Sequence, residues 1–314
     1  MKFPFKLRSE CKFDVIGFGT NAVDYLVRVP SYPEFNSKVE LTSYELAAGG
    51  EVASTLTGLQ RLGMRTAYAG RFGGDREGEF GRGSLAAEGV DLSFAETLEG
   101  VRTQVGFIII DERSGERTVI WHRDEGLAYR AADPADSIAV DGRILHLTPH
   151  DTEACIRLAG LARSNGVVVS LDVDRPVDGI QSLLPLVDIC IGSSDFALQL
   201  FGIDDPAAGL GEIASRFGCG VVGLTLGESG SIFLCGGKLI ETTAFQVPGP
   251  CVDTTGAGDA FRAGFLYGIL TDSSVEDSAK FANAVAALKC RTPGARTGLP
   301  RSYELHSFVT SPRH

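Results

Sequence analysis

The chain has 314 residues, of which 44% are hydrophobic and 22% are charged, proportions typical of a globular protein with a sizeable core. Its formal net charge of -11 excludes a largely basic surface, so neither nucleic acid nor an anionic membrane is expected as the main partner. The seven cysteines are never spaced as CxxC, and no apolar run approaches the ~18 residues of a membrane span, so we expect a cytoplasmic protein with reduced thiols.

The first ninety residues predict strands and helices in alternation, with one interruption. A short apolar run at 13–16 predicts a buried strand that ends in a glycine turn. No helix follows it, because residues 25–29 and 38–41 favour strands and two prolines separate them. After them the pattern changes to βα alternation, which is typical of a parallel sheet. The elements expected there are a helix at 49–63, a strand at 66–70 and a helix at 80–88.

Residues 101–122 interrupt the alternation a second time. Val101–Ile110 and Arg117–Trp121 are rich in β-favouring residues, and 111–116 between them is a turn-rich connection. These strands can pair with the earlier ones as a small separate sheet. We therefore expect one domain over residues 1–314, with a β lid contributed by about 24–46 and 101–123.

After residue 141 the alternation is steady. Strands are expected at 144–147, 167–172, 189–191, 221–226 and 231–234. Helices are expected at 152–165, near Gln181, and at 196–201, 260–270 and 275–290, with an irregular tail behind them.

The most specific stretch runs from Asp253 to Phe261 and reads Asp-Thr-Thr-Gly-Ala-Gly-Asp-Ala-Phe at the start of a helical pattern. Gly256 and Gly258 let the backbone approach a phosphate, and the free amides at a helix start are donors for an anion. Asp259 is unexpected there, because a carboxylate repels phosphate. Accepting a proton from an attacking hydroxyl would explain its presence. The apolar residues that follow predict an amphipathic helix with Phe261, Phe265 and Ile269 on one face.

Other motifs are less specific. The stretch from Gly17 to Ala22 has the form of a dinucleotide fingerprint, but no helix begins within it, which disfavours a nicotinamide-dependent dehydrogenase. The pair Gly49-Gly50 opens a helix, where it fits either a polar ligand or a plain turn. The histidines lack metal-ligand spacing and no Gly-x-Ser-x-Gly is present, so neither a zinc site nor a serine hydrolase is expected.

Together these residues resemble the PfkB, or ribokinase-like, family of carbohydrate kinases. The resemblance covers nearly the whole chain, and its most specific part is Asp253 to Phe261. It also includes Asp24, Gly49-Gly50, Gly73-Gly74-Asp75, Thr225-Leu226-Gly227 with Gly230, Asn283 and Pro293-Gly294-Ala295. It implies a ribokinase-like α/β fold, with a central mostly parallel sheet, helices on both faces and a small β lid.

The resemblance also implies roles for individual residues. Asp259 would deprotonate the acceptor hydroxyl, and the amides of Gly256, Ala257 and Gly258 would bind the transferred phosphoryl group. ATP with Mg²⁺ is the expected cofactor. Its implied binding residues are Ser193, Thr225, Gly227, Ser229, Gly230, Gly256, Gly258 and Asn283, with Asn283 near adenine. The implied sugar-binding residues are Asp24, Gly49, Gly50, Ser54 and Asp259. Asp253 and Thr255 match positions that bind a monovalent cation such as K⁺ in some members.

Three positions depart from the family pattern and bear on the acceptor. Ser54 and Ala22 stand where ribokinases carry substrate-binding asparagines, and Ser193-Ser194-Asp195-Phe196 replaces the Asn-x-x-Glu motif, as in the ketohexokinase branch. A ketohexose such as fructose is therefore expected in place of ribose. The alternatives are a nucleoside kinase of the same fold and a non-catalytic sugar- or nucleotide-binding protein. The resemblance also implies a homodimer formed through the lid.

Overall fold

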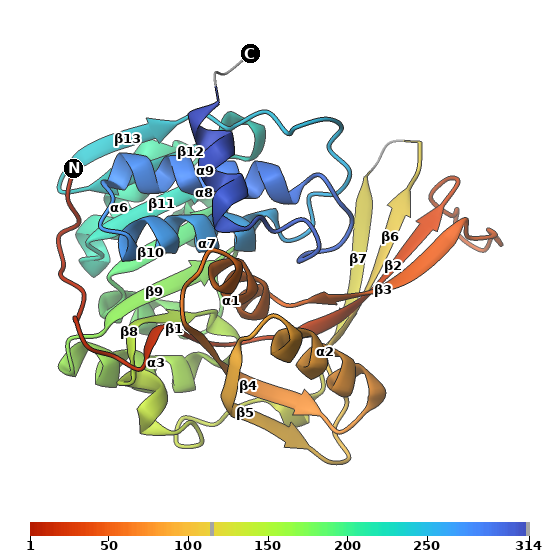
Figure 1. Ribbon diagram of the computed structural model, residues 1–314, viewed down its shortest axis with the longest axis horizontal. Helices are drawn as coiled ribbons and strands as arrows, with labels where there is room; N and C mark the ends of the chain where they lie inside the picture. The colour runs from red at the N-terminus through yellow and green to blue at the C-terminus, as the bar shows by residue number, and fades with distance from the viewer. Residues whose placement is uncertain (114–115, 312–314) are drawn as a thin grey trace.

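A nine-stranded sheet forms the centre of the computed structural model, which describes residues 1–113 and 116–311 (Figure 1). Its strands are β1 (Phe13–Phe18), β4 (Thr66–Gly73), β5 (Asp91–Leu98), β8 (Gly142–Leu147), β9 (Val168–Val173), β10 (Ile189–Ser193), β11 (Val221–Thr225), β12 (Ser231–Cys235) and β13 (Lys238–Thr242). They lie in the order β13-β12-β11-β10-β9-β8-β1-β4-β5. All neighbours from β5 to β11 are parallel, and β12 and β13 add an antiparallel edge.

Helices cover both faces of this sheet. Because successive residues of a strand point to opposite faces, Val15 joins one hydrophobic core and Ile16 the other. The first core contains side chains of α1 (Glu51–Arg61), α2 (Arg76–Ala87), α7 (Ala257–Leu270), α8 (Val275–Lys289) and α9 (Ser302–Thr310). The second contains side chains of α3 (Thr152–Ser164), α4 (Ile180–Leu183), α5 (Phe196–Phe201) and α6 (Pro206–Phe217). The expected α/β class, a mostly parallel sheet between helices, is confirmed.

Helix α7 lies inside the molecule, with α1 and α8 packed against it. Every residue from Ala260 to Leu270 is buried, so the expectation of an amphipathic helix was wrong. The close approach of α8 depends on small residues: a Cβ at Gly264 would lie 2.7 Å from the Cα of Ala282. The middle of α7 is thereby held between α1 and α8.

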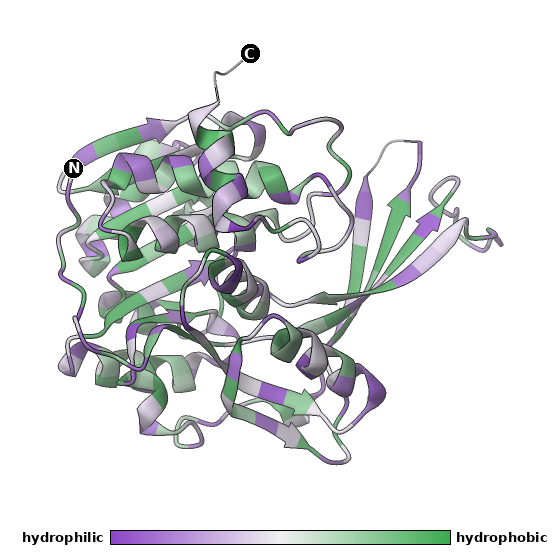
Figure 2. Ribbon diagram, viewed as in Figure 1, coloured by the Kyte–Doolittle hydropathy of each residue, from purple (hydrophilic) through white to green (hydrophobic). Residues whose placement is uncertain are grey.

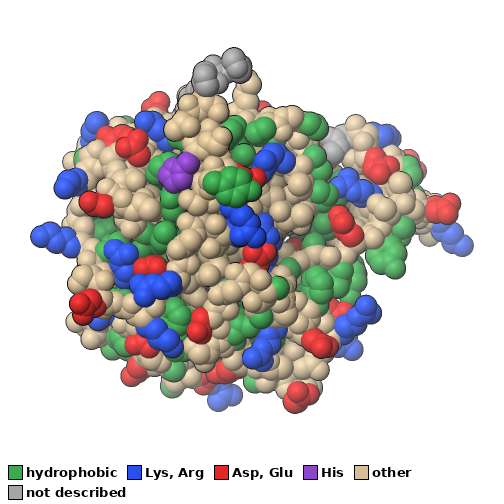
Figure 3. Space-filling view, in the orientation of Figure 1, with side chains coloured by type: hydrophobic (Ala, Val, Ile, Leu, Met, Phe, Trp, Pro, Cys, Tyr) green, Lys and Arg blue, Asp and Glu red, His purple; other side chains and the backbone are tan. Residues whose placement is uncertain are grey.

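A second sheet projects from the main body (Figure 1). Its strands β2 (Ala22–Val29), β3 (Ser43–Gly49), β6 (Val105–Asp111) and β7 (Arg117–His122) lie in the order β3-β2-β6-β7. The register pairs Asp24 with Gly106 and Gly106 with Trp121, so these residues form one row across the sheet. Figure 2 shows the hydrophobic colouring of the large sheet continuing along the projecting strands. In Figure 3 acidic and basic side chains are interspersed over the visible face.

Most expected elements are present, with shifted ends, but the strand expected at 38–41 is absent, since β3 begins only at Ser43, and some elements were missed. Strands β5 and β13 and helix α6 were not predicted, and the tail expected to be irregular contains α9. Only Leu305 of α9 is buried, which leaves too narrow an apolar stripe for the sequence to reveal a helix. The turn expected at 111–116 includes Ser114 and Gly115, which lie outside the described residues. Within the described residues, no helix has the length and apolar composition needed to cross a bilayer.

Candidate active site

The loop that enters α7 is built around Gly256. This residue caps the helix with a φ of 74°, and an added Cβ would lie 2.8 Å from the Cα of Ala295, so only glycine fits. The amide of Ala257 donates to the carbonyl of Thr254 at 3.1 Å, whereas those of Gly258 and Asp259 have no acceptor among the described residues. The amide of Gly256 has no acceptor there either, so the free donors for an anion are at 256, 258 and 259. The expected role of the Ala257 amide conflicts with this turn.

Asp253 holds this loop in place. Its carboxylate accepts hydrogen bonds from the backbone amides of Thr255 and Gly294, each at 2.8 Å. Its carbonyl accepts a 2.7 Å hydrogen bond from the ammonium of Lys289, whose side chain is fully buried. Asp253 does not line the neighbouring cavity, although Thr255 does.

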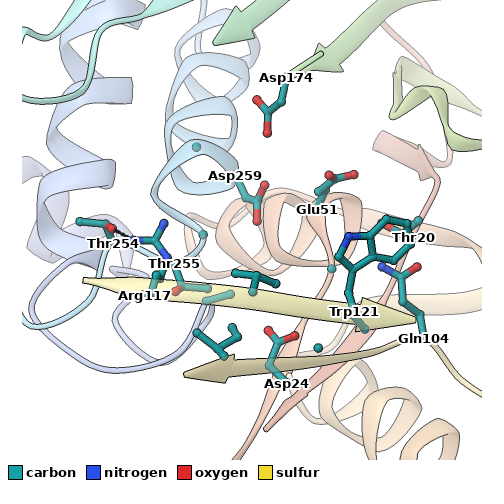
Figure 4. A pocket seen from close by; sticks show the side chains of 18 of the residues that line it. Thr20, Asp24, Glu51, Gln104, Arg117, Trp121, Asp174, Thr254, Thr255 and Asp259 are labelled. Carbon is teal, nitrogen blue, oxygen red and sulfur yellow. Dashed lines mark hydrogen bonds between the residues drawn. The ribbon is translucent and has the colours of Figure 1, made fainter. Parts of the chain in front are cut away.

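The side chain of Asp259 faces a cavity of about 470 Å³ between the main body and the projecting sheet (Figure 4). Burial raises the pKa of Asp259 well above its ordinary value, and the negative charges of Glu51 and Asp174 raise it further, against the opposing charge of Arg262. A carboxylate with a raised pKa is a stronger base than an exposed one. Its position at the helix start, beside free amides, places this base next to the candidate anion site.

A buried arginine lies beneath Asp259. Arg262 forms ion pairs with Asp172 at 2.6 Å and with Asp174 at 3.1 Å. A Cβ at Gly258 would clash with the guanidinium, so this glycine makes room for Arg262 as well as for a ligand. The sequence offered a weak signal for this cluster, two aspartates at the carboxyl end of β9, and we did not predict it.

Asp24 lies on the opposite wall of the same cavity. A Cβ at Gly49 or at Gly106 would clash with its carboxylate, so the two glycines make space for it on the neighbouring strands. Burial raises the pKa of Asp24 to about 6, Arg296 opposes the rise, and Asp253 adds to it. None of the described residues forms a hydrogen bond with this carboxylate. It is therefore available to accept hydrogen bonds from a ligand.

Gly50 and Ser54 differ in their relation to the cavity. Gly50 lines it and begins α1 with a φ of 91°, and a Cβ there would clash with the backbone of Asn21. Ser54 is completely buried outside the lining, where its hydroxyl is 3.4 Å from Nε of Arg296. Arg296 also donates to the carbonyl of Gly49. The expected sugar contact of Ser54 is thus not seen, because Arg296 occupies its hydroxyl.

The remaining walls combine polar and apolar groups, of which sequence reasoning missed the polar ones. Thr20 Oγ1 and Gln104 Oε1 are buried without a hydrogen-bond partner among the described residues, and both residues line the cavity. Ile108, Val119 and Trp121 supply the apolar part. No pattern in the sequence pointed to Gln104, because its position depends on which strands pair.

A second cavity of about 290 Å³ lies on the other side of the loop at 254–258. Its lining includes five of the expected nucleotide-binding residues, namely Thr225, Gly227, Gly230, Gly258 and Asn283. Ser229 and Ser193 line neither cavity, and the Ser193 hydroxyl donates to the carbonyl of Asp174 at 2.7 Å. Both cavities are lined by Thr225, Thr254 and Gly258, so they meet at the candidate anion site.

Comparisons with known proteins agree with this geometry. The model of the pfkB family of carbohydrate kinases matches residues 14–302. A nucleoside kinase of Methanothermobacter thermautotrophicus is 28% identical over 93% of this chain and 94% of its own. The crystal structure of a putative ribokinase from Agrobacterium tumefaciens has a TM-score of 0.87 and 25% identity, over 95% of this chain and 97% of its own. The crystal structure of a putative ribokinase II from E. coli in complex with ATP and Mg²⁺ has a TM-score of 0.82 and 22% identity, over 96% of this chain and 100% of its own. The fold is therefore ribokinase-like.

Proposed function

The chain belongs to the pfkB family of carbohydrate kinases, so it is an ATP-dependent kinase of a sugar or nucleoside hydroxyl, and we propose that Asp259 is its catalytic base. One observation carries the proposal. Asp259 and Asp24 face the same cavity, and that cavity meets the second one at Thr254 and Gly258. A hydroxyl bound by Asp24 would thus lie on the acceptor side of the anion site, with ATP on the other side.

The proposed reaction follows from these positions. Hydroxyl groups of the acceptor donate hydrogen bonds to the Asp24 carboxylate, which orients the reacting hydroxyl toward Asp259. Asp259 takes its proton as the oxygen attacks the γ-phosphorus, and ADP leaves. The free amides of residues 256, 258 and 259 donate to the phosphoryl oxygens and stabilise the charge that develops on them.

Magnesium would neutralise charge on the phosphates of ATP. Among the described residues, no group of three or more His, Cys, Asp or Glu side chains is arranged to hold a metal ion. This fits an ion that keeps most of its waters and is held chiefly by phosphate oxygens. We propose that Glu51 and Asp174, which line the cavity beside Asp259, would hold the ion in the role of the missing Asn-x-x-Glu motif.

The monovalent cation expected at Asp253 and Thr255 is the subject of a separate proposal, in which a side chain of the protein takes its place. The Asp253 carbonyl, an oxygen of the kind that binds K⁺, already accepts a hydrogen bond from Lys289. We infer that the Lys289 ammonium supplies the positive charge that K⁺ supplies elsewhere. Replacing K⁺ by tetramethylammonium should then change the wild-type rate less than the rate of Lys289→Met. Equal dependence of both proteins on K⁺ would contradict this role.

A ketohexose such as fructose is the acceptor that we propose, because Ala22 and Ser54 leave the ribokinase asparagine contacts unfilled and Asp24, Thr20 and Gln104 offer unpaired polar atoms instead. A nucleoside is the second candidate. The wall of Ile108, Val119 and Trp121 favours it, since an aromatic base packs well on such a surface.

A substrate panel tests these proposals. Fructose, tagatose, ribose, 2-keto-3-deoxygluconate and adenosine would each be incubated with ATP and Mg²⁺, and ADP release and phosphorylated product would be measured. We expect kcat/KM for a ketohexose to exceed that for ribose by about 100-fold or more. If adenosine is the only compound of the panel that is phosphorylated, a nucleoside is the acceptor and the ketohexose proposal is wrong. Sugar binding without any turnover would indicate a non-catalytic binding protein.

We also propose that the projecting sheet is a lid that closes over the acceptor and excludes water. The face turned away from the cavity exposes Tyr44, Phe107 and Ile120, which is more apolar surface than a free sheet face usually presents. A second copy of the chain covering this face would account for it. Light scattering should give a dimer mass for the wild type and a monomer mass for Ile120→Lys. A wild-type monomer would contradict the proposal.

A further inference from the structure

Arg117 links the projecting sheet to the loop that enters α7. It begins β7, and its side chain lies on the same face of the sheet as those of Val119 and Trp121, all of which line the larger cavity. The guanidinium donates a hydrogen bond to Oγ1 of Thr254 (Figure 4). Because Thr254 lines both cavities, Arg117 lies at the point where acceptor and nucleotide would meet.

The charges around this point distinguish Arg117 from Arg262. Arg262 is neutralised by Asp172 and Asp174. No carboxylate among the described residues forms an ion pair with Arg117, whose partner is a neutral hydroxyl. The same cavity contains four carboxylates, those of Asp24, Glu51, Asp174 and Asp259, so an incoming phosphate is repelled unless a cation accompanies it. An uncompensated guanidinium beside the anion site can provide that charge.

We propose that Arg117 is a catalytic residue whose guanidinium leaves Thr254 and binds the terminal phosphoryl group of ATP. The inference rests on the proposed kinase function, and it adds a residue of the projecting sheet to those proposed to act in phosphoryl transfer. A planar guanidinium can donate two hydrogen bonds to one phosphoryl group, and it stabilises the charge spread over the oxygens during transfer. Since β7 carries Arg117, this contact also couples closure of the sheet to the presence of the triphosphate.

A purely structural role makes a different prediction. If Arg117 only latches the sheet to the loop, removing either partner of the hydrogen bond has the same effect, so Thr254→Val would match Arg117→Ala. If Arg117 binds phosphate, function is lost chiefly in variants that lack the guanidinium. Thr254→Val then has a smaller effect, and Arg117→Lys, which keeps the charge, restores part of the function.

The test measures binding without turnover. Trp121 is the sole tryptophan of the chain and lies four residues from Arg117 on β7, so its fluorescence reports on the sheet. Affinities for a non-hydrolysable ATP analogue and for ADP, both with Mg²⁺, would be measured by this signal and by calorimetry. The proteins are wild type, Arg117→Ala, Arg117→Lys and Thr254→Val. Arg113→Ala serves as the control, because Arg113 belongs to the same hairpin but is paired with Asp111.

We expect the preference for the triphosphate over ADP to fall about tenfold or more in Arg117→Ala and by less in the other variants, with no change in Arg113→Ala. Once the substrate panel has identified an acceptor that the wild type phosphorylates, kcat of Arg117→Ala for that acceptor should fall about 100-fold or more, with KM for the acceptor little changed. A preference within about twofold of wild type, or an equal loss in Thr254→Val, would overturn the inference. If the triphosphate preference is lost as expected but wild type phosphorylates no acceptor, the proposed function fails and the phosphate contact stands.

Discussion

The guanidinium of Arg262 lies 2.6 Å from the carboxylate of Asp172, and the two side chains are only 3% and 5% exposed. Breaking a buried ion pair leaves one charge without a partner, which costs more free energy than removing both. We expect Arg262→Met to lower the free energy of unfolding by about 3–5 kcal/mol, and Arg262→Met with Asp172→Leu to lower it by less. Urea unfolding followed by circular dichroism measures both. An additive loss in the double variant would show that the pair is not coupled.

Acceptor binding should depend on pH through Asp24. Its pKa is raised to about 6, so the carboxylate is ionised above that pH and becomes protonated below it. Only the ionised form accepts hydrogen bonds at both oxygens. Between pH 7 and pH 5 we therefore expect the dissociation constant of the acceptor to rise roughly tenfold. Titration of Trp121 fluorescence without ATP measures it. The variant Asp24→Asn should bind weakly at every pH, and an unchanged pH dependence in that variant would exclude Asp24 as the titrating group.

The backbone at Gly50 requires glycine, whereas that at Gly83 does not. Gly50 has a φ of 91° and no room for a Cβ, so Gly50→Ala should weaken acceptor binding and lower stability by about 1–3 kcal/mol. Gly83 lies within α2 with nothing near its Cβ position, so Gly83→Ala should raise stability by about 0.5–1 kcal/mol. Chemical denaturation of both variants gives the comparison. Equal effects of the two substitutions would contradict the local geometry.

Acid sensitivity should depend on His146. Burial lowers the pKa of this imidazole to about 3, while the unfolded chain binds the proton near 6.5. As the pH falls below about 6.5, the unfolded state takes up a proton that the folded state excludes, and stability falls by up to ~1.4 kcal/mol per pH unit. We expect His146→Gln to remove this amount from the slope of unfolding free energy against pH between 4 and 6. An unchanged slope would show that His146 is protonated in the folded protein.

Local patterns could predict only candidate site residues that lie within one stretch of chain. The stretch Asp253 to Asp259 and the pair Gly49-Gly50 were found because their glycines and acids stand next to one another and open helices. The alternation of strand and helix gave the parallel sheet for the same reason. The departures at Ala22 and Ser54 and the ketohexokinase-like stretch Ser193-Ser194-Asp195-Phe196 also came from local comparison, and the identity of the acceptor stays a prediction.

Contacts between distant segments could not be predicted in this way. Arg117 reaches the cavity because β6 and β7 pair in one particular register, which no local pattern specifies. Thr20 and Gln104 reach it from the segments that enter β2 and β6. The burial of α7 on all sides depends on helices elsewhere in the chain, and this made an amphipathic prediction wrong. The use of the Ala257 amide within a turn is a detail of backbone geometry that residue types do not reveal.

The most direct test of the account is the activity of Asp259→Asn, which keeps the shape of the side chain and removes the base. With an acceptor that the wild type phosphorylates in the substrate panel, kcat of this variant should fall by about 100-fold to 10,000-fold. The affinity for the non-hydrolysable ATP analogue should stay within about threefold of wild type, because Asp259 lies on the acceptor side of the loop. A variant that releases ADP and forms product at a near-normal rate would contradict the central claim that Asp259 accepts the proton.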